Sequence, residues 1–287
     1  MFIPPLRIVL SGGGIRGLSY AGCFLELEKL NYLKCVKEFL CVSCGALFAF
    51  AYIIGYTPNE IYLLARDLDY TLIQNLDADI AFNYLDNYGI DDGSNLEKFL
   101  DSLLRNKGYT KHIRFSQLYE KTKIHFRVFA VELNNCKLTE FSYKRSPDES
   151  IIFALRASMC IPGYFVPMKK DNILYIDGGL LNNYPIHLIP YEEQIYTLGF
   201  VFKQTNMYKE KIETFIDFIN QMFTCMNSKK KVYTENTVSI PCGDFPLWKF
   251  DANEEERLYL IECGRKAVKN FYTKFKIQKP LRRNSVS

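Results

Sequence analysis

Histidine, tryptophan and long apolar runs are scarce in this sequence. Three histidines and one tryptophan occur among its 287 residues. Neither the histidines nor the cysteines show the paired spacing that a zinc site needs, and no apolar run approaches the roughly 20 residues that cross a bilayer. The sequence therefore predicts no metal, no cofactor and no transmembrane helix, and we expect any contact with lipid at a membrane surface.

The net charge is also low. A formal charge of +4 is too small to indicate nucleic-acid binding. Positive charge gathers at the C-terminal end, where eight basic residues and no acidic ones follow from Arg265 onward. We interpret this end as a solvated basic tail, with attraction to an anionic membrane surface as the alternative. The sequence leaves the oligomeric state open.

The nine cysteines are odd in number and irregularly spaced. No signal peptide is recognisable, because the first five residues lead directly into a strand-like run. Both features favour a reducing, intracellular and cytoplasmic setting, with possible peripheral attachment to membranes. A hydrophobic fraction of 48% and a charged fraction of 24% are ordinary for a globular chain that buries a sizeable core.

Short apolar runs alternate with helical patterns along the first 205 residues. This order predicts an α/β fold in which a mostly parallel sheet is covered by helices on both faces. We expect a catalytic α/β core over residues 1–205. Residues 206–287 are expected to form a helical extension packed on it, with helices at about 209–226 and 254–275 joined by a loop. Residues 69–92 are the least regular and are expected to form a lid or a substrate-facing segment.

Ser43 lies at the corner between an apolar strand pattern over residues 38–42 and a helical pattern that begins at Cys44. A serine on such a strand-to-helix elbow projects its hydroxyl outward beside a helix N-terminus, as a nucleophile requires. The alternative is a serine that merely caps the helix. A nucleophilic serine needs a base and an oxyanion site nearby.

A glycine-rich stretch, Gly12-Gly13-Gly14-Ile15-Arg16-Gly17, follows the first strand. Backbone amides at the start of the next helix can point at an oxyanion, and Arg16 adds positive charge. The stretch also matches the dinucleotide-binding pattern of glycines, which would make the chain a nucleotide-binding protein. That pattern requires an acidic residue after the next strand, where this sequence instead has the Ser43 corner.

Asp177 ends a predicted strand and is followed by Gly178 and Gly179. It is either a turn aspartate or the general base for Ser43. His187 follows in the chain order of serine hydrolase triads, but it lies just beyond a proline at a predicted helix start. A Ser–Asp dyad is therefore the more economical arrangement. Because ligand sites in α/β sheets lie beyond the carboxyl ends of the strands, we expect these clusters to meet at one edge.

With these three clusters in this order, the chain resembles the patatin-like phospholipase family from about residue 6 to residue 202. Residues 154–158, 161–165 and 182–185 also look like family segments around the aspartate. The resemblance implies a three-layer α/β/α sandwich and a Ser43–Asp177 dyad. It also implies an oxyanion hole formed by Gly12, Gly13 and Gly14, with Arg16 nearby. The implied activity is calcium-independent, phospholipase A-type cleavage of fatty acyl esters of membrane lipids through an acyl-enzyme intermediate.

The elbow departs from the family pattern Gly-x-Ser-x-Gly at one position. Gly45 is kept, but Cys41 replaces the first glycine. Cys41 and Cys44 form a Cys-x-x-Cys pair, which we interpret as two small packed residues rather than a redox pair. We expect activity to be preserved. The alternative is a lipid-binding or regulatory patatin-like protein with an impaired site.

Overall fold

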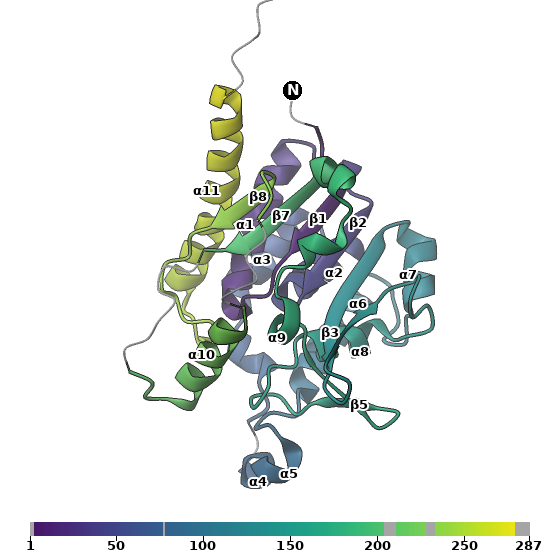
Figure 1. Ribbon diagram of the computed structural model, residues 1–287, viewed down its shortest axis with the longest axis vertical. Coiled ribbons are helices and arrows are strands. Elements are labelled where there is room, and N and C mark those ends of the chain that lie inside the picture. The colour runs from purple at the N-terminus through teal and green to yellow at the C-terminus, as the bar shows by residue number, and fades with distance from the viewer. Residues whose placement is uncertain (1–2, 77, 204–210, 228–232, 279–287) are drawn as a thin grey trace, which may run out of the picture.

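A computed structural model describes residues 3–76, 78–203, 211–227 and 233–278 (Figure 1). Five parallel strands lie in the order β8-β7-β1-β2-β3 at the centre of the sheet, and three antiparallel strands join at β3 and β6. The strands are β1 (Arg7–Leu10), β2 (Glu38–Val42), β3 (His125–Glu132), β4 (Lys137–Phe141), β5 (Met168–Lys170), β6 (Ile173–Asp177), β7 (Thr197–Phe202) and β8 (Thr237–Ile240).

Helices flank this sheet, as the sequence predicted. The α-helices are α1 (Ser19–Lys29), α2 (Cys44–Ile53), α3 (Pro58–Asp67), α4 (Ala78–Phe82), α5 (Tyr84–Asn87), α6 (Ser94–Asn106), α7 (Phe115–Thr122), α8 (Ile151–Ser158), α9 (Gly179–Asn182), α10 (Phe215–Asn227) and α11 (Glu254–Gln278). The short 3₁₀ helices are η1 (Gly14–Leu18), η2 (Leu33–Cys35), η3 (Tyr70–Ile73), η4 (Pro185–Leu188) and η5 (Tyr191–Tyr196).

The central strands are apolar on both faces because both faces are covered. In β1, Ile8 and Leu10 belong to a large cluster with the main helical layer, whereas Val9 belongs to a smaller cluster on the other face. Ile186 of η4 and Ile189 complete the smaller cluster. The helical cover is therefore thick on one face and thin on the other.

Helix α11 packs against α1, and glycine on each helix permits the contact. A Cβ atom at Gly22 of α1 would lie 1.9 Å from the Ile261 carbonyl oxygen. One at Gly264 of α11 would lie 1.9 Å from the Ser19 carbonyl oxygen. The two backbones therefore touch at the crossing, which only glycine allows. This contact holds the C-terminal helix against the first one.

The segment that follows β7 differs in detail from the sequence prediction. Helix α10 begins at Phe215 rather than near residue 209, and the predicted loop before α11 contains β8, which pairs in parallel with β7. The sheet therefore extends beyond residue 205. Arg282 and Arg283 of the predicted basic tail lie outside the described residues.

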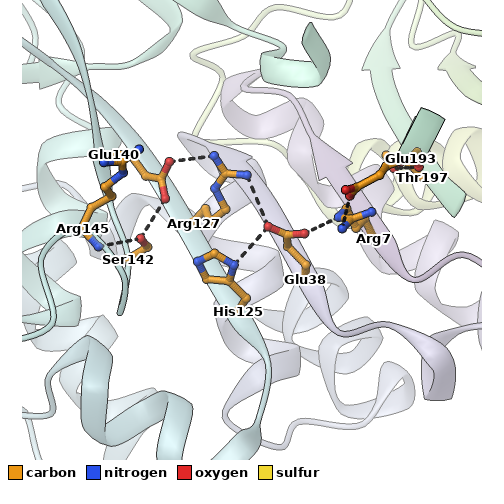
Figure 2. A network of polar contacts seen from close by, with 9 residues as sticks. All are labelled: Arg7, Glu38, His125, Arg127, Glu140, Ser142, Arg145, Glu193 and Thr197. Carbon is orange, nitrogen blue, oxygen red and sulfur yellow. Dashed lines mark hydrogen bonds and ion pairs between the residues drawn. The ribbon is translucent and has the colours of Figure 1, made fainter. Parts of the chain in front are cut away.

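The amino ends of the strands carry an ionic network (Figure 2). The parallel register places Arg7 of β1, Glu38 of β2 and His125 of β3 side by side. Glu38 accepts from Arg7, from His125 Nδ1 at 3.1 Å and from Arg127 Nη1 at 3.3 Å. Burial favours the neutral Glu38 carboxyl, but the bonds from His125 and Arg7 outweigh it and lower its pKa to about 2. The network joins three neighbouring strands at the edge opposite the Ser43 corner.

Candidate active site

Ser43 occupies a strained corner between β2, which ends at Val42, and α2, which begins at Cys44. Its backbone angles are φ 52° and ψ −127°, a conformation that a residue with a side chain adopts only when its surroundings impose it. The Ser43 amide donates to Ser158 Oγ at 2.9 Å, and Ser158 Oγ donates to the Phe129 carbonyl at 2.7 Å. A hydrogen-bond chain from β3 therefore helps to hold the corner in place.

The residues on either side of the corner fit it differently. A Cβ atom at Gly45 would lie 2.7 Å from the Leu10 carbonyl oxygen and 2.8 Å from that of Ser11, so α2 reaches β1 only with glycine there. Cys41 pairs with Leu10 within the sheet, and its side chain is fully buried in the large core cluster. The core therefore has room for a side chain where the family pattern has its first glycine.

The thiols beside Ser43 are protonated. Burial raises the pKa of both Cys41 and Cys44 far above the ordinary value. Both cysteines are free, and neither is exposed. They are therefore poor nucleophiles, in keeping with their interpretation as small packed residues.

Strand β6 ends at Asp177 and runs antiparallel to β3, along the edge of β3 that also pairs with β2. Strand β4 pairs with residues 128–132 of β3 along one edge, so β6, which pairs with residues 130–132, must use the edge that β2 occupies at residues 125–129. The end of β6 therefore meets the end of β2. The sequence predicted that Asp177 ends a strand at this edge of the sheet, but β6 runs antiparallel to β3.

The Asp177 carboxylate is buried, with 4% of the residue exposed. Its Oδ1 accepts a hydrogen bond from the Gly179 amide at 2.7 Å, and the nearby Ser43 hydroxyl also favours the charged form of the carboxylate. Burial outweighs the effects of the Ser43 hydroxyl and the Gly179 amide and raises the pKa of Asp177 to about 6. A Cβ atom at Gly178 would lie 2.4 Å from the Phe129 carbonyl oxygen, so this turn packs directly on β3.

The glycine-rich stretch passes directly beside Ser43. A Cβ atom at Gly12 would lie 3.1 Å from the Ser43 Cβ. The Gly12 backbone exchanges two hydrogen bonds with the Asn183 side chain, at 3.1 and 3.0 Å. Among the described residues, no backbone acceptor is found for the amides of Gly13 and Gly14, and the Gly13 amide faces the Cys44 sulfur. These two amides are the better candidates for an oxyanion hole.

Arg16 is not among the residues that line the pocket beside Ser43, and its side chain contacts the loop after β8. Its Nε donates to the Phe245 carbonyl at 2.6 Å. Burial lowers its pKa, although Cys242 and Asp244 nearby favour the charged form. The Ile15 amide donates to the Leu247 carbonyl at 2.9 Å. The loop after β8 therefore supports the glycine-rich stretch from behind.

An apolar pocket opens beside the Ser43 hydroxyl. It encloses about 530 Å³ of empty space, part of it open to solvent. Ser43 is its one hydroxyl apart from that of Tyr70, and 7% of Ser43 is exposed. The other lining side chains that project into it are almost all aliphatic or aromatic and include Ile15, Leu47, Ile73, Leu96, Met159 and Phe250. Such a wall suits a hydrocarbon chain.

The histidines lie apart from this site. His187 is exposed within η4, His112 is also exposed, and His125 belongs to the network at the amino ends of the strands. In the described parts of the chain, no group of three His, Cys, Asp or Glu side chains has a geometry that would hold a metal ion. No helix among the described residues is long and apolar enough to cross a membrane.

Two supporting residues were not assigned roles from the sequence. Ser158 holds the Ser43 amide and Asn183 clamps Gly12. Both lie in segments that had suggested the family resemblance. Their roles depend on contacts more than 100 residues away along the chain, which the sequence pattern does not reveal.

Comparison with known proteins agrees with this geometry. A family model described as patatin-like phospholipase matches residues 8–189. A probable lipid hydrolase of Invertebrate iridescent virus 6 is 35% identical over 63% of this chain and 62% of its own length. An uncharacterized protein of Acanthamoeba polyphaga mimivirus is 29% identical over 92% of both chains.

Solved structures share the fold at low sequence identity. VipD from Legionella pneumophila gives a TM-score of 0.65 at 17% identity, with 94% of this chain and 67% of that chain covered. The type III effector protein ExoU gives 0.57 at 18% identity, with 96% of this chain and 54% of that chain covered. The matched family model, the aligned relatives and the shared fold place this chain in the patatin-like phospholipase family.

Proposed function

We propose that this protein is a lipid acyl hydrolase of phospholipase A type that uses Ser43 as its nucleophile and Asp177 as its base. The observation that carries the proposal is the Ser43 corner, which lines an apolar pocket and lies beside the buried Asp177 carboxylate. A buried carboxylate accepts a proton more readily than an exposed one because its charged form is poorly solvated. With a pKa of about 6, Asp177 is ionised at neutral pH and still a competent base.

The reaction follows from the positions of these groups. Asp177 takes the proton of Ser43 while the serine oxygen attacks the ester carbonyl. The amides of Gly13 and Gly14 stabilise the oxyanion of the tetrahedral intermediate. Collapse of this intermediate expels the lyso-lipid alcohol, which takes the proton from Asp177, and leaves an acyl-enzyme. Asp177 then deprotonates a water molecule, which releases the fatty acid and restores Ser43.

No metal ion or cofactor takes part in this scheme. The oxyanion is stabilised by backbone amides, and the nucleophile is activated by a carboxylate, so activity should persist in a chelator. The apolar pocket receives the acyl chain. The proposed substrate is therefore a phospholipid or a related acyl lipid at a membrane surface.

The nucleotide-binding alternative loses its support at the glycine-rich stretch. A Cβ atom at Gly13 would lie 2.3 Å from the Phe202 ring, and one at Gly14 would lie 2.1 Å from the Leu247 carbonyl oxygen. These contacts account for the glycines as close-packing positions, and the acidic residue that the dinucleotide pattern requires after the next strand is replaced by the Ser43 corner. The labelling experiment below distinguishes an active hydrolase from the alternative, a lipid-binding protein with an impaired site.

An alkyl fluorophosphonate, which reacts with activated serines, tests the nucleophile directly. Intact mass spectrometry should show one adduct on the natural protein and on Ser102→Ala, a control at an exposed helical serine. Ser43→Ala should remain unlabelled, and Asp177→Asn should react about 10³-fold more slowly because the base is lost. Equal labelling of Ser43→Ala would disprove the assignment, and no labelling of the natural protein would favour the impaired site.

A further inference from the structure

Between η3 and α6 the chain exposes a cluster of apolar side chains. Phe82 is 90% exposed and Leu85 is 82% exposed, and three further large apolar residues of this segment are more than half exposed. We call the cluster the apolar tip; it consists of Leu72, Leu76, Phe82, Leu85 and Tyr88. Single exposed apolar residues are common on proteins, but five in one short segment indicate an interaction surface.

The base of the apolar tip is firmly held. The buried Asp91 carboxylate accepts from the Asn75 amide at 2.8 Å and from the Gly93 amide at 2.7 Å, so it joins the two ends of the segment. The amides of Ile90 and Asp91 both donate to the Tyr164 carbonyl, at 2.8 and 3.0 Å. The two most exposed side chains, Phe82 and Leu85, belong to the projecting helices α4 and α5, which lie at the end of the molecule farthest from the N-terminus (Figure 1).

The segment that carries the apolar tip also contributes to the wall of the Ser43 pocket. Tyr70 and Ile73 of η3 line that pocket, and Leu72 between them is 67% exposed. Gln74 donates to the Tyr164 hydroxyl, whose neighbour Phe165 also lines the pocket. The η3 end of the apolar tip therefore adjoins the wall of the pocket that holds the nucleophile.

The charge of residues 70–90 indicates which type of lipid surface the apolar tip would bind. Residues 70–90 contain three aspartates and neither lysine nor arginine. An anionic partner would be repelled, because binding to anionic lipid relies on basic residues near the surface. A zwitterionic or neutral lipid surface matches a segment that offers aromatic and aliphatic side chains without positive charge.

We propose that the apolar tip inserts into a zwitterionic lipid surface and so places the pocket mouth against the membrane. This inference rests on the proposed function, since a lipid substrate must pass from that surface into the adjoining pocket. An exposed apolar surface could also bind a second copy of the chain. The lipid surface is favoured because the segment that carries the apolar tip also contributes Tyr70 and Ile73 to the pocket wall and contains no positive charge.

Binding to phosphatidylcholine vesicles tests the proposal independently of catalysis. The measurement uses Ser43→Ala protein, which cannot consume the vesicles, and compares it with the same protein carrying Phe82→Ser and Leu85→Ser. Both side chains are almost fully exposed, so the fold does not depend on them. Each inserted side chain should strengthen partitioning about tenfold, so the double change should weaken it by roughly a hundredfold.

The matched control is Tyr191→Ser, which removes an aromatic side chain that is 87% exposed in η5, near the amino ends of the strands. It should bind vesicles like the parent. Equal weakening by the control, or unchanged binding in the double variant, would overturn the proposal. So would a natural protein that sediments as a dimer and becomes monomeric in the double variant, because the apolar tip would then be a self-association face.

Activity measurements on two substrates distinguish a failure of this membrane-docking proposal from a failure of the proposed function. With Ser43 intact, the double variant should lose hydrolysis of phosphatidylcholine vesicles but keep hydrolysis of a water-soluble short-chain ester. If both activities fell together, the apolar tip would act within the site rather than at a membrane. If no form of the protein hydrolysed either substrate, the proposed function would fail, and the vesicle partitioning would still decide the docking surface. Vesicles that also contain phosphatidylserine should not increase the part of the binding that depends on Phe82 and Leu85.

Discussion

Asp177→Asn should stabilise the protein while it abolishes activity. The carboxylate of Asp177 is buried, and burial raises its pKa from an ordinary 3.8 to about 6. A raised pKa means that the folded protein holds the proton more tightly than the unfolded chain does. Folding therefore becomes less favourable as the pH rises from about 4 to about 6, where the buried group must ionise, and the cost stays constant above that range. Asparagine has nearly the same shape and carries no charge.

The size of the effect follows from the pKa difference. A shift of about two pKa units corresponds to about 3 kcal/mol of unfolding free energy at neutral pH. For a chain of this length, that gain should raise the melting temperature by roughly 5 to 10 °C. Activity should fall about 10³-fold, because Ser43 would lose its base. Such opposite effects on stability and activity are typical of a catalytic group held in an unfavourable environment.

Urea denaturation of the natural protein and the variant, at several pH values between 4 and 8, measures the difference. The two unfolding free energies should coincide near pH 4 and diverge up to about pH 6. Asp86→Asn, at an exposed position in α5, should show no such divergence. A variant that is less stable than the natural protein at pH 8, or equally stable at every pH, would refute the reasoning about burial.

Three further predictions concern the supports of the site and the sheet. Glu38→Gln should cost about 2 kcal/mol of unfolding free energy at pH 7, after allowance for solvent screening. Acid unfolding should show this loss disappearing as the pH falls from 4.5 towards 2, where the natural Glu38 becomes protonated. A loss that does not depend on pH would contradict the role of the Glu38 charge. Gly22→Ala should force α1 away from the Ile261 carbonyl and cost about 1–3 kcal/mol by thermal unfolding, whereas Asn270→Ala, on the exposed side of α11, should not. Ser158→Ala should leave the buried Ser43 amide without its acceptor and lower the unfolding free energy by about 1–3 kcal/mol. It should also lower kcat more than it changes KM. An unchanged kcat would mean that the Ser43 corner holds its shape without this hydrogen bond.

Local signals in the sequence were sufficient for much of this fold. The Ser43 corner was predicted because an apolar run and a helical pattern meet at one residue, and β2 and α2 indeed end and begin there. Helix α3 begins with a capping box between Thr57 and Glu60, which depends only on residues three apart in the sequence. Such features depend on neighbours a few residues away, which is why the sequence reveals them.

Features that depend on distant partners were missed or misjudged. Strand β8 is only four residues long, and its assignment rests on pairing with β7. The direction of β6 cannot be read from its composition, because the same apolar run suits a parallel or an antiparallel neighbour. Asn183 resembles an ordinary loop residue until the fold brings it to Gly12. In each case the deciding contact joins segments far apart in the sequence.

The most direct test of the central claim is the release of free fatty acid from phospholipid vesicles in the presence of a chelator. The natural protein should release fatty acid, and Ser43→Ala should reduce the rate to that of vesicles alone. The rate of the natural protein should fall as the pH decreases through about 6, because Asp177 becomes protonated. Release that persists in Ser43→Ala, or that requires added calcium, would contradict the account.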